Sequence, residues 1–436
     1  MSFLGKCGQR LEEYSLYAVL FLLPFSKASV EVGFGLLLLG WLLSWCDPST
    51  RPTTIWTRPQ LRLLAWWLLG YLAACAASIF VSDFPEQSVK GFIGKWAEYL
   101  LYFVLVAELG ARPKVAERTI AVIAWSSLCV MIEGLHQERF HRGLFIPRPM
   151  PPDFMRMTGP YENPIDLATY LMVVIPPLLV AAVNFRGWKR WAVGGLTFLL
   201  TLCLARTRAL GAWIGFGMGL ASLLLIRRRL WRLGLGLAAI LAIVGALFLY
   251  QHGSLGTVFS LSEIGKVDRL MMWQAALRMI HDRPVLGHGV NTFMANYLRY
   301  WVGGEQQPRY AHNCYLQVAA ETGLIGLTML LGLLGTFFVR LLVRMRPGPG
   351  QVSPHSLLFE PSQLLLAGLF AGLLAFALQS GIDTNFYALR QAALFWIVSG
   401  LALGLSERSV SKSNKEARVA LFTPAGHETQ PSAPRQ

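Results

Sequence analysis

Charged residues are scarce in this chain. They make up 14% of its 436 residues, whereas 54% are hydrophobic and the mean hydropathy is +0.46. A soluble globular domain carries about 25% charged residues. The composition therefore excludes an ordinary soluble domain and predicts an all-α polytopic membrane protein.

Signals for a metal ion, a nucleotide or a disulfide framework are also missing. There is no HExxH motif, no paired Cys/His spacing and no Asp-x-Asp pair in a predicted outer loop, and the glycine-rich segments lack the lysine of a phosphate-binding loop. Five of the six cysteines lie in or beside apolar stretches, and only Cys314 lies near the predicted outer surface. We therefore expect no cofactor, a metal-independent site and no disulfides.

Twelve apolar stretches are present, and a span needs about 20 apolar residues to cross the hydrocarbon layer. The first two, the seventh and the last are short by this measure, which leaves a count of ten to twelve. Because no signal-peptide cleavage pattern is seen, the first stretch is expected to remain as an anchor. The stretches lie near residues 11–26, 31–46, 61–80, 92–109, 119–136, 166–184, 190–205, 209–226, 232–250, 316–339, 362–380 and 388–405.

The net charge of +15 is explained mostly by topology. With both termini in the cytoplasm, 23 of the 39 Lys and Arg residues fall on cytoplasmic segments, as the positive-inside rule requires. The excess is therefore no footprint of nucleic acid. The other 16 cluster on the outer side, where cations need another reason such as binding an anion.

Four regions follow from this pattern. Residues 1–250 are expected to hold nine spans, with a proline-rich outer loop at 137–165. Residues 251–315 form a long outer loop with short helices, 316–406 hold three more spans, and 407–436 form a disordered cytoplasmic tail.

The long outer loop contains a predicted helix at about 267–282. Leu270, Trp273, Leu277 and Ile280 recur at helical spacing and predict one apolar face, and Asp268 could cap the helix. Such a helix lies against the membrane or packs across the ends of spans. Arg269 would stand in its first turn.

His312 and Asn313 precede the tenth span. If a helix begins at His312, then Asn313, Gln317 and Glu321 share one face. A polar face in a membrane span must meet protein or water. His312 is either an interfacial histidine at a helix cap or a general base, because imidazole titrates near neutral pH. Cys314 is a poor candidate nucleophile, because residues two apart do not face each other on a helix.

Three outer arginines on separate segments, Arg156, Arg208 and Arg269, could converge on one anion, because guanidinium offers a planar fork for phosphate oxygens. The alternative is that they meet lipid headgroups or local carboxylates. Arg206 is the alternative to Arg208.

Several motifs resemble the O-antigen ligase and polymerase superfamily of bacterial inner-membrane glycosyltransferases. They are Arg269 to Trp273, Pro284-Val285-Leu286-Gly287-His288-Gly289, His312-Asn313 with nine residues before Gly323 and Gly326, Arg156 to Pro164, and Thr207-Arg208 before Gly211. The spacing from His312 to Gly326 is similar to the ligase signature within that superfamily.

The resemblance implies a GT-C-like fold of about twelve spans and a periplasmic active site. It implies transfer of a polysaccharide from undecaprenyl diphosphate to a sugar hydroxyl of lipid A–core oligosaccharide. Arg156, Arg208 and Arg269 would bind the diphosphate and His312 would be the catalytic base. The supporting candidates are Arg206, Asn313, Tyr310, Gln317, Glu321 and His288.

Other functions stay open from the sequence. An O-antigen polymerase or a protein O-oligosaccharyltransferase would use the same lipid-linked donor, and a transporter of lipid-linked glycans would need no catalytic base. A transporter should carry ionisable residues in the middle of many spans, and these are few here.

Overall fold

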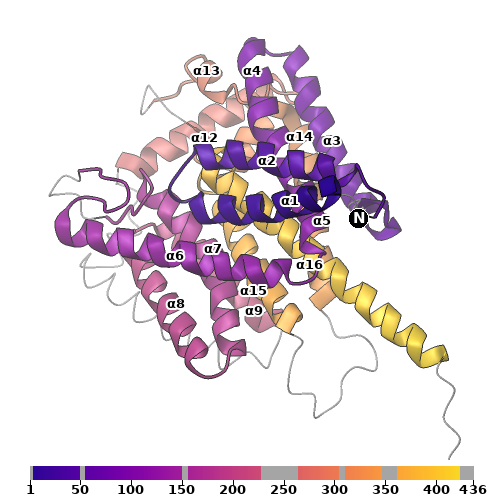
Figure 1. Cartoon of the computed structure of the whole chain (residues 1–436). Coiled ribbons are helices and arrows are strands. Elements are labelled where there is room, and N and C mark those ends of the chain that lie inside the picture. Colours follow the sequence, from indigo (N-terminus) through magenta and orange to yellow (C-terminus); the bar gives the residue numbers. More distant parts are fainter. Residues whose placement is uncertain are drawn as a thin grey trace, which may run out of the picture.

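The computed structural model describes residues 3–49, 55–149, 156–226, 264–303, 310–345 and 361–422. These residues form a bundle of helices, and no strand occurs among them beyond one isolated bridge between Arg142 and Pro149. The predicted all-α class is confirmed (Figure 1).

The helices follow the apolar stretches of the sequence. The first half contains α1 (Phe3–Leu22), α2 (Ala28–Ser44), η1 (Ile55–Thr57), η2 (Pro59–Leu61), α3 (Arg62–Phe80), α4 (Pro85–Gly91), the π-helical turn η3 (Phe92–Ala97), α5 (Glu98–Gly110), α6 (Val115–Phe140), α7 (Pro164–Asn184), α8 (Trp188–Arg206) and α9 (Leu210–Ile226). The second half contains α12 (Ile264–Asp282), α13 (Phe293–Tyr297), α14 (Cys314–Met345), α15 (Pro361–Gln379), η5 (Asn385–Tyr387) and α16 (Leu389–Phe422).

Within the described residues, six helices are long and apolar enough to cross a membrane, and Ala28–Ser44 and Leu210–Leu223 are shorter apolar helices. Peripheral helices also expose large apolar side chains, such as Trp66 on α3 and Trp191 on α8. A surface of this kind suits lipid. The structure therefore supports a polytopic membrane protein. The count of twelve stays a prediction, and the expected span at 232–250 lies outside the described residues.

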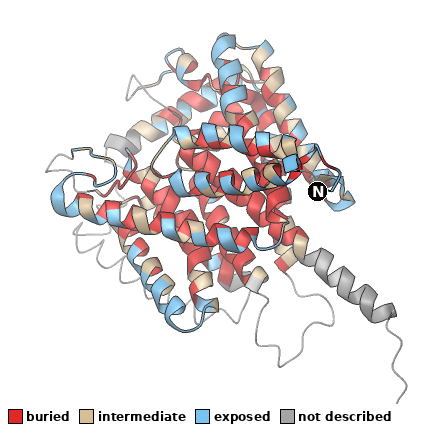
Figure 2. Ribbon diagram, viewed as in Figure 1, coloured by how far each residue is buried: buried red, intermediate tan, exposed pale blue. Residues whose placement is uncertain are grey.

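The core lies around α15 and the first part of α16: most residues of Ser362–Gln379 and nearly all of Leu389–Arg408 are buried (Figure 2). Helix α15 packs against α7 and α9, and α16 packs against α5. Small residues permit this close approach: a Cβ atom at Gly372 would overlap the carbonyl oxygen of Val173, and one at Gly219 would overlap that of Ala371.

Ion pairs divide the bundle into two ends that match the predicted inner and outer segments. At the predicted inner end, Glu407 pairs with Arg58, Arg340 and Arg344. At the predicted outer end, the pairs include Lys27–Glu162 and Asp83–Arg299. Among the described residues, no ion pair joins one group to the other. The chain therefore alternates between two ends, and which of them faces the periplasm stays a prediction.

Several predicted boundaries differ from the structure. Helix α16 continues to Phe422, so the tail expected to be disordered from 407 is helical over its first part. Residues 423–436 lie outside the described part. In the outer loop, α12 begins at Ile264, four residues before the predicted cap Asp268, so Arg269 lies in its second turn.

The predicted apolar face of α12 is buried only in part, because Trp273 and Ile280 are half-buried. Leu270 and Leu277 are exposed, and the helix buries Met272, Ala275, Ala276 and Met279 where it packs against α14. Two adjacent alanines present little side chain, so this face lets the helix approach α14 closely. The proline-rich loop is shorter than the predicted 137–165, because α6 continues to Phe140 and α7 begins at Pro164, and the described residues between them form no helix.

Candidate functional site

Three of the predicted arginines come together. The Nε of Arg156 donates to the carbonyl oxygen of Thr207 at 2.9 Å, which places Arg156 beside Arg208. The pKa of Arg156 is lowered from its usual value, first by burial and then by the positive charges of Arg208 and Arg269. Arg208 and Arg269 therefore both lie within electrostatic range of Arg156, although the three residues come from the 141–163 loop, the α8–α9 turn and α12.

The loop that carries Arg156 is fixed to neighbouring helices by main-chain contacts. The N–H groups of Thr158 and Gly159 donate to Gln137 Oε1 at 3.1 and 2.9 Å. The N–H of Met157 donates to the carbonyl oxygen of Arg206 at 3.1 Å. The position of Arg156 thus depends on the ends of α6 and α8 and not on the loop alone.

The structure separates Arg206 from Arg208. The guanidinium of Arg206 pairs with Glu138 at the end of α6. Arg208 has no ion pair to a described carboxylate and adopts a left-handed backbone conformation with φ of +52°. A non-glycine residue in this region is uncommon and often marks a site of function. The geometry therefore favours Arg208 as the member of the cluster.

Asp383 lies between the arginines and His312. It belongs to the short connection between α15 and α16, and its Oδ1 is 3.5 Å from His312 Nδ1. Its charge acts on Arg156, and Arg269 Nη1 donates to the carbonyl oxygen of the preceding Ile382 at 3.5 Å. Three arginines and one aspartate leave an excess of two positive charges, which a diphosphate would neutralise.

Local packing holds His312 and Asp383 in place. Cys314 donates from its N–H to the carbonyl oxygens of Ser380 and Asp383, at 2.8 and 3.2 Å, and from its Sγ to that of Asp383. Trp273 Nε1 donates to the carbonyl oxygen of His312 at 3.3 Å. Cys314 is completely buried, so it positions the α15–α16 connection and is not exposed as a nucleophile.

His312 itself is half-buried, and its backbone φ is +49°. The helix does not begin there: Asn313 is the N-cap of α14, because its Oδ1 accepts from the N–H groups of Tyr315 and Leu316 at 3.0 Å. Asn313 therefore supports the site by ending the turn that presents the imidazole. The buried Nδ1 of His312 has no hydrogen-bond partner among the described residues, and Asp383 is the group that it faces.

Glu321 is a structural residue. It is completely buried and accepts four hydrogen bonds, from the N–H groups of Asn291 and Phe293, from Gln317 Nε2 and from the Tyr387 hydroxyl, at 2.7 to 3.1 Å. Gln317 also accepts from the N–H of Ala311 at 3.0 Å. The predicted polar face of Gln317 and Glu321 thus joins α14 to the outer loop and to Tyr387.

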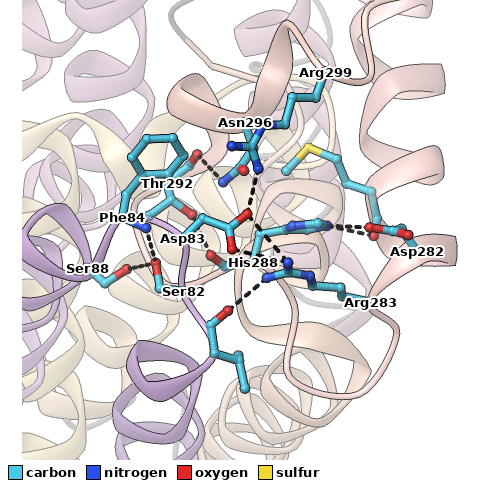
Figure 3. Close-up of polar contacts among 12 residues, drawn as sticks. Ser82, Asp83, Phe84, Ser88, Asp282, Arg283, His288, Thr292, Asn296 and Arg299 are labelled. Atoms are coloured by element: carbon cyan, nitrogen blue, oxygen red, sulfur yellow. Dashed lines mark hydrogen bonds and ion pairs between the residues drawn. The ribbon is translucent and has the colours of Figure 1, made fainter.

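His288 lies away from His312, in the polar group shown in Figure 3. It is buried, its Nε2 lies 3.2 Å from the carbonyl oxygen of Met279, and its ring contacts Tyr300. Burial lowers the pKa of His288 below its usual value. Its neighbours Arg283 and Arg299 both bind Asp83 in the turn between α3 and α4 (Figure 3). His288 therefore helps to fold the loop.

Tyr310 lies close to the site but on another side. Its ring is 5.9 Å from that of Tyr387, and Lys95 Nζ lies 5.9 Å from both ring centres. Within the described residues, no group of three His, Cys, Asp or Glu side chains could hold a metal ion. Metal independence stays a prediction.

Two contributors were missed from the sequence, Asp383 and Gln137. Asp383 is a carboxylate at the predicted outer end of the eleventh span, and that position was the available signal. For Gln137 the sequence offers no signal, because its role depends on a contact with Thr158, which lies 21 residues away in the chain.

Comparison with known proteins supports the predicted resemblance. Residues 194–331 match the model of the O-antigen ligase family. This segment includes Arg208, Arg269 and His312, whereas Arg156 and Asp383 lie outside it. No curated protein matches the chain.

Proposed function

We propose that this protein, whose residues 194–331 match the model of the O-antigen ligase family, is an O-antigen ligase of the bacterial inner membrane. It would move O-antigen polysaccharide from undecaprenyl diphosphate to a sugar hydroxyl of lipid A–core oligosaccharide. The fold would be GT-C-like with about twelve spans, both termini cytoplasmic and the site periplasmic. The observation that carries the proposal is the cluster of Arg156, Arg208 and Arg269 beside the His312–Asp383 pair.

In this mechanism the three arginines bind the donor diphosphate. The bond between the anomeric carbon and the diphosphate oxygen breaks, and its electron pair leaves with undecaprenyl diphosphate. The guanidinium groups stabilise the charge that develops on that oxygen. Cations placed in advance at such a charge are usually the largest catalytic contribution.

His312 accepts the proton of the acceptor hydroxyl as its oxygen bonds to the anomeric carbon from the opposite face, with inversion. Asp383, facing Nδ1 at 3.5 Å, keeps the proton of the imidazole on that nitrogen. Nε2 is then free to act as the base, which contributes about 10²- to 10⁴-fold. No step needs a metal ion.

Reconstitution tests the proposal. The purified protein is incubated with lipid-linked O-antigen and lipid A–core, without added metal ion or ATP, and ligated product is measured for the wild type and for His312→Ala. We expect product from the wild type alone. Arg208→Ala and Arg269→Ala should lose at least as much activity as His312→Ala, and near-normal ligation in both arginine variants would contradict the mechanism.

The same assay separates the alternatives. A polymerase would lengthen the glycan when given the lipid-linked donor alone, and a protein O-oligosaccharyltransferase would label a protein acceptor. A ligase gives neither product. In cells, deletion of a ligase would in addition leave unmodified core.

A further inference from the structure

Three arginines from separate parts of the chain surround one buried carboxylate at the predicted inner end of the bundle. The carboxylate is that of Glu407 on α16, which is buried. Arg58 reaches it from the segment before η2, and Arg340 and Arg344 reach it from the last two turns of α14. Among the described residues, these arginines pair with no other carboxylate. The group therefore holds two more positive charges than negative ones.

One of the three, Arg340, is enough to neutralise the carboxylate. Its Nε and Nη2 both donate to Glu407 Oε1, at 2.9 and 2.5 Å, and only 14% of its side chain is exposed. Elsewhere at the same end, a buried carboxylate has a single cation: within the described part of the chain, Glu12 pairs with Arg112 alone, at 2.5 Å. Burying charges without a counter-charge is costly, so the other two arginines need a reason beyond this ion pair.

Arg58 and Arg344 lie close to each other and are open to the surroundings. Arg58 Nη1 is 3.1 Å from Glu407 Oε2 and Arg344 Nη2 is 3.5 Å from Oε1, so both guanidinium groups contact the same carboxylate. Their side chains are 33% and 21% exposed. Arg344 Nε donates to no described residue, so the protein does not saturate this guanidinium. Two cations this close repel each other, and an anion beside them removes that repulsion.

Both arginines lie at the level where the helices leave the apolar layer. Arg344 is in the last turn of α14, a helix long and apolar enough to cross a membrane, and the adjacent Val343 is exposed. Arg58 precedes α3, whose first turns expose Leu63 and Trp66. Helices α3 and α14 pack against each other. Basic groups between helix ends at this depth are suited to lipid headgroups.

We propose that Arg58 and Arg344 bind the headgroup phosphate of an anionic phospholipid, at the end of the bundle opposite to the candidate site. Guanidinium groups form charge-assisted hydrogen bonds with phosphate oxygens, and these are among the stronger hydrogen bonds. The acyl chains lie along the exposed apolar side chains of α3 and α14. Because the phosphate is bound from the start of one helix and the end of the other, the lipid stabilises the contact between them.

The test compares Arg58→Gln and Arg344→Gln with the wild type, each as the full chain purified in neutral detergent. Phosphatidylglycerol or phosphatidylethanolamine is added in steps, bound lipid is counted by native mass spectrometry, and the unfolding temperature is measured. Phosphatidylglycerol should bind to the wild type and raise its unfolding temperature, and phosphatidylethanolamine should not. Each substitution should weaken phosphatidylglycerol binding about 10-fold or more, as for loss of a hydrogen bond to a charged group. Without the anionic lipid, both variants should unfold at nearly the wild-type temperature, because Arg340 still pairs with Glu407.

Arg112→Gln is the matched control. Arg112 is also paired with a buried glutamate, and its side chain is 21% exposed, as is that of Arg344. Its loss leaves Glu12 without its ion-pair partner, so the unfolding temperature should fall with either lipid while phosphatidylglycerol binding stays normal. If Arg344→Gln behaves like this control, with a lower unfolding temperature in both lipids and normal phosphatidylglycerol binding, the arginines are a structural clamp and the proposal is overturned.

A second titration separates a lipid from a soluble anion. The wild type in detergent receives inorganic phosphate or glycerol 3-phosphate at the concentrations that saturate the effect of phosphatidylglycerol. We expect no rise in unfolding temperature, because the acyl chains contribute to binding. A rise that disappears in Arg344→Gln would identify a site for a soluble phosphate and overturn the assignment to lipid. None of these measurements uses a glycan substrate, so their outcome is independent of the proposed function.

Discussion

Removing the guanidinium of Arg206 or of Arg208 should have opposite consequences, although the two residues are separated by only Thr207. Arg206 pairs with Glu138, and the two side chains are 42% and 37% exposed. Exposed pairs of this kind stabilise a protein by about 0.2–1 kcal/mol. Arg206→Ala should therefore cost about that much stability and leave ligation within about threefold of the wild type.

Arg208 has no such carboxylate and lies in the cluster with Arg156. Each charge-assisted hydrogen bond lost to the donor diphosphate should weaken transition-state binding by about 1.5–3 kcal/mol, or about 10- to 150-fold in rate. Two lost bonds would put Arg208→Ala beyond the detection of most ligation assays, while its folded protein should remain as abundant as the wild type.

The measurement is ligation rate with the thermal stability of each variant, including Arg206→Ala combined with Glu138→Ala. The double-mutant cycle should give a coupling free energy of at most about 1 kcal/mol between Arg206 and Glu138. Near-normal ligation by Arg208→Ala together with more than a hundredfold loss in Arg206→Ala would refute the assignment, since it would place the phosphate contact on the paired arginine.

Three further substitutions probe the packing that supports the site. Glu321→Gln should destabilise the protein by about 1.5–3 kcal/mol, measured by denaturation in detergent. The new NH2 group would face a backbone N–H, such as that of Asn291, even if the Tyr387 hydroxyl rotated to accept a hydrogen bond from it. Gly323→Ala should cost about 2–4 kcal/mol, because φ is +70° and the new Cβ would overlap the carbonyl oxygen of Val285, whereas Gly335→Ala in the same helix meets no atom and should be neutral in the same experiment. The pKa of Asp83 is lowered mainly by the hydrogen bond from Arg299. The ionised Asp83 therefore stabilises the folded state fully above the ordinary pKa of an aspartate, and this stabilisation is lost as the pH falls through the lower pKa of the folded state. Hydrogen exchange in residues 283–303 should therefore increase below about pH 4 in the wild type, and Asp83→Asn should show that faster exchange already at pH 7.

The helices were predictable because burial in lipid or in the core demands long apolar runs, and these are visible in one dimension. Helix α12 shows the limit of that signal. Its period was recognised, but Leu270 and Leu277 are exposed while Ala275 and Ala276 are buried. In a protein that meets lipid, a large apolar residue can face outward and a small one can mark the contact between helices.

The arginine cluster was predictable in part, because cations at the predicted outer end need a local reason. The choice between Arg206 and Arg208 was not, since it depends on Glu138, which lies 68 residues away in sequence. Asp383 was missed for a similar reason. It lies next to His312 through the fold, in which Cys314 binds the α15–α16 connection.

The residues of the motif from His312 to Gly326 have different roles in the structure. Among the described residues of this segment, only His312 has a side chain in ion-pair contact with Asp383. Asn313 caps α14, Glu321 binds the turn at Asn291 and Phe293, and Gly323 lets the backbone of Val285 approach. Because the N–H groups of His288 and Gly289 also donate to the carbonyl oxygens of Ala320 and Glu321, the two glycine-containing motifs are two halves of one contact. Their spacing is therefore set by the packing of the outer loop on α14. The same packing places Trp273 Nε1 near the carbonyl oxygen of His312 and Arg269 near that of Ile382, the residue before Asp383.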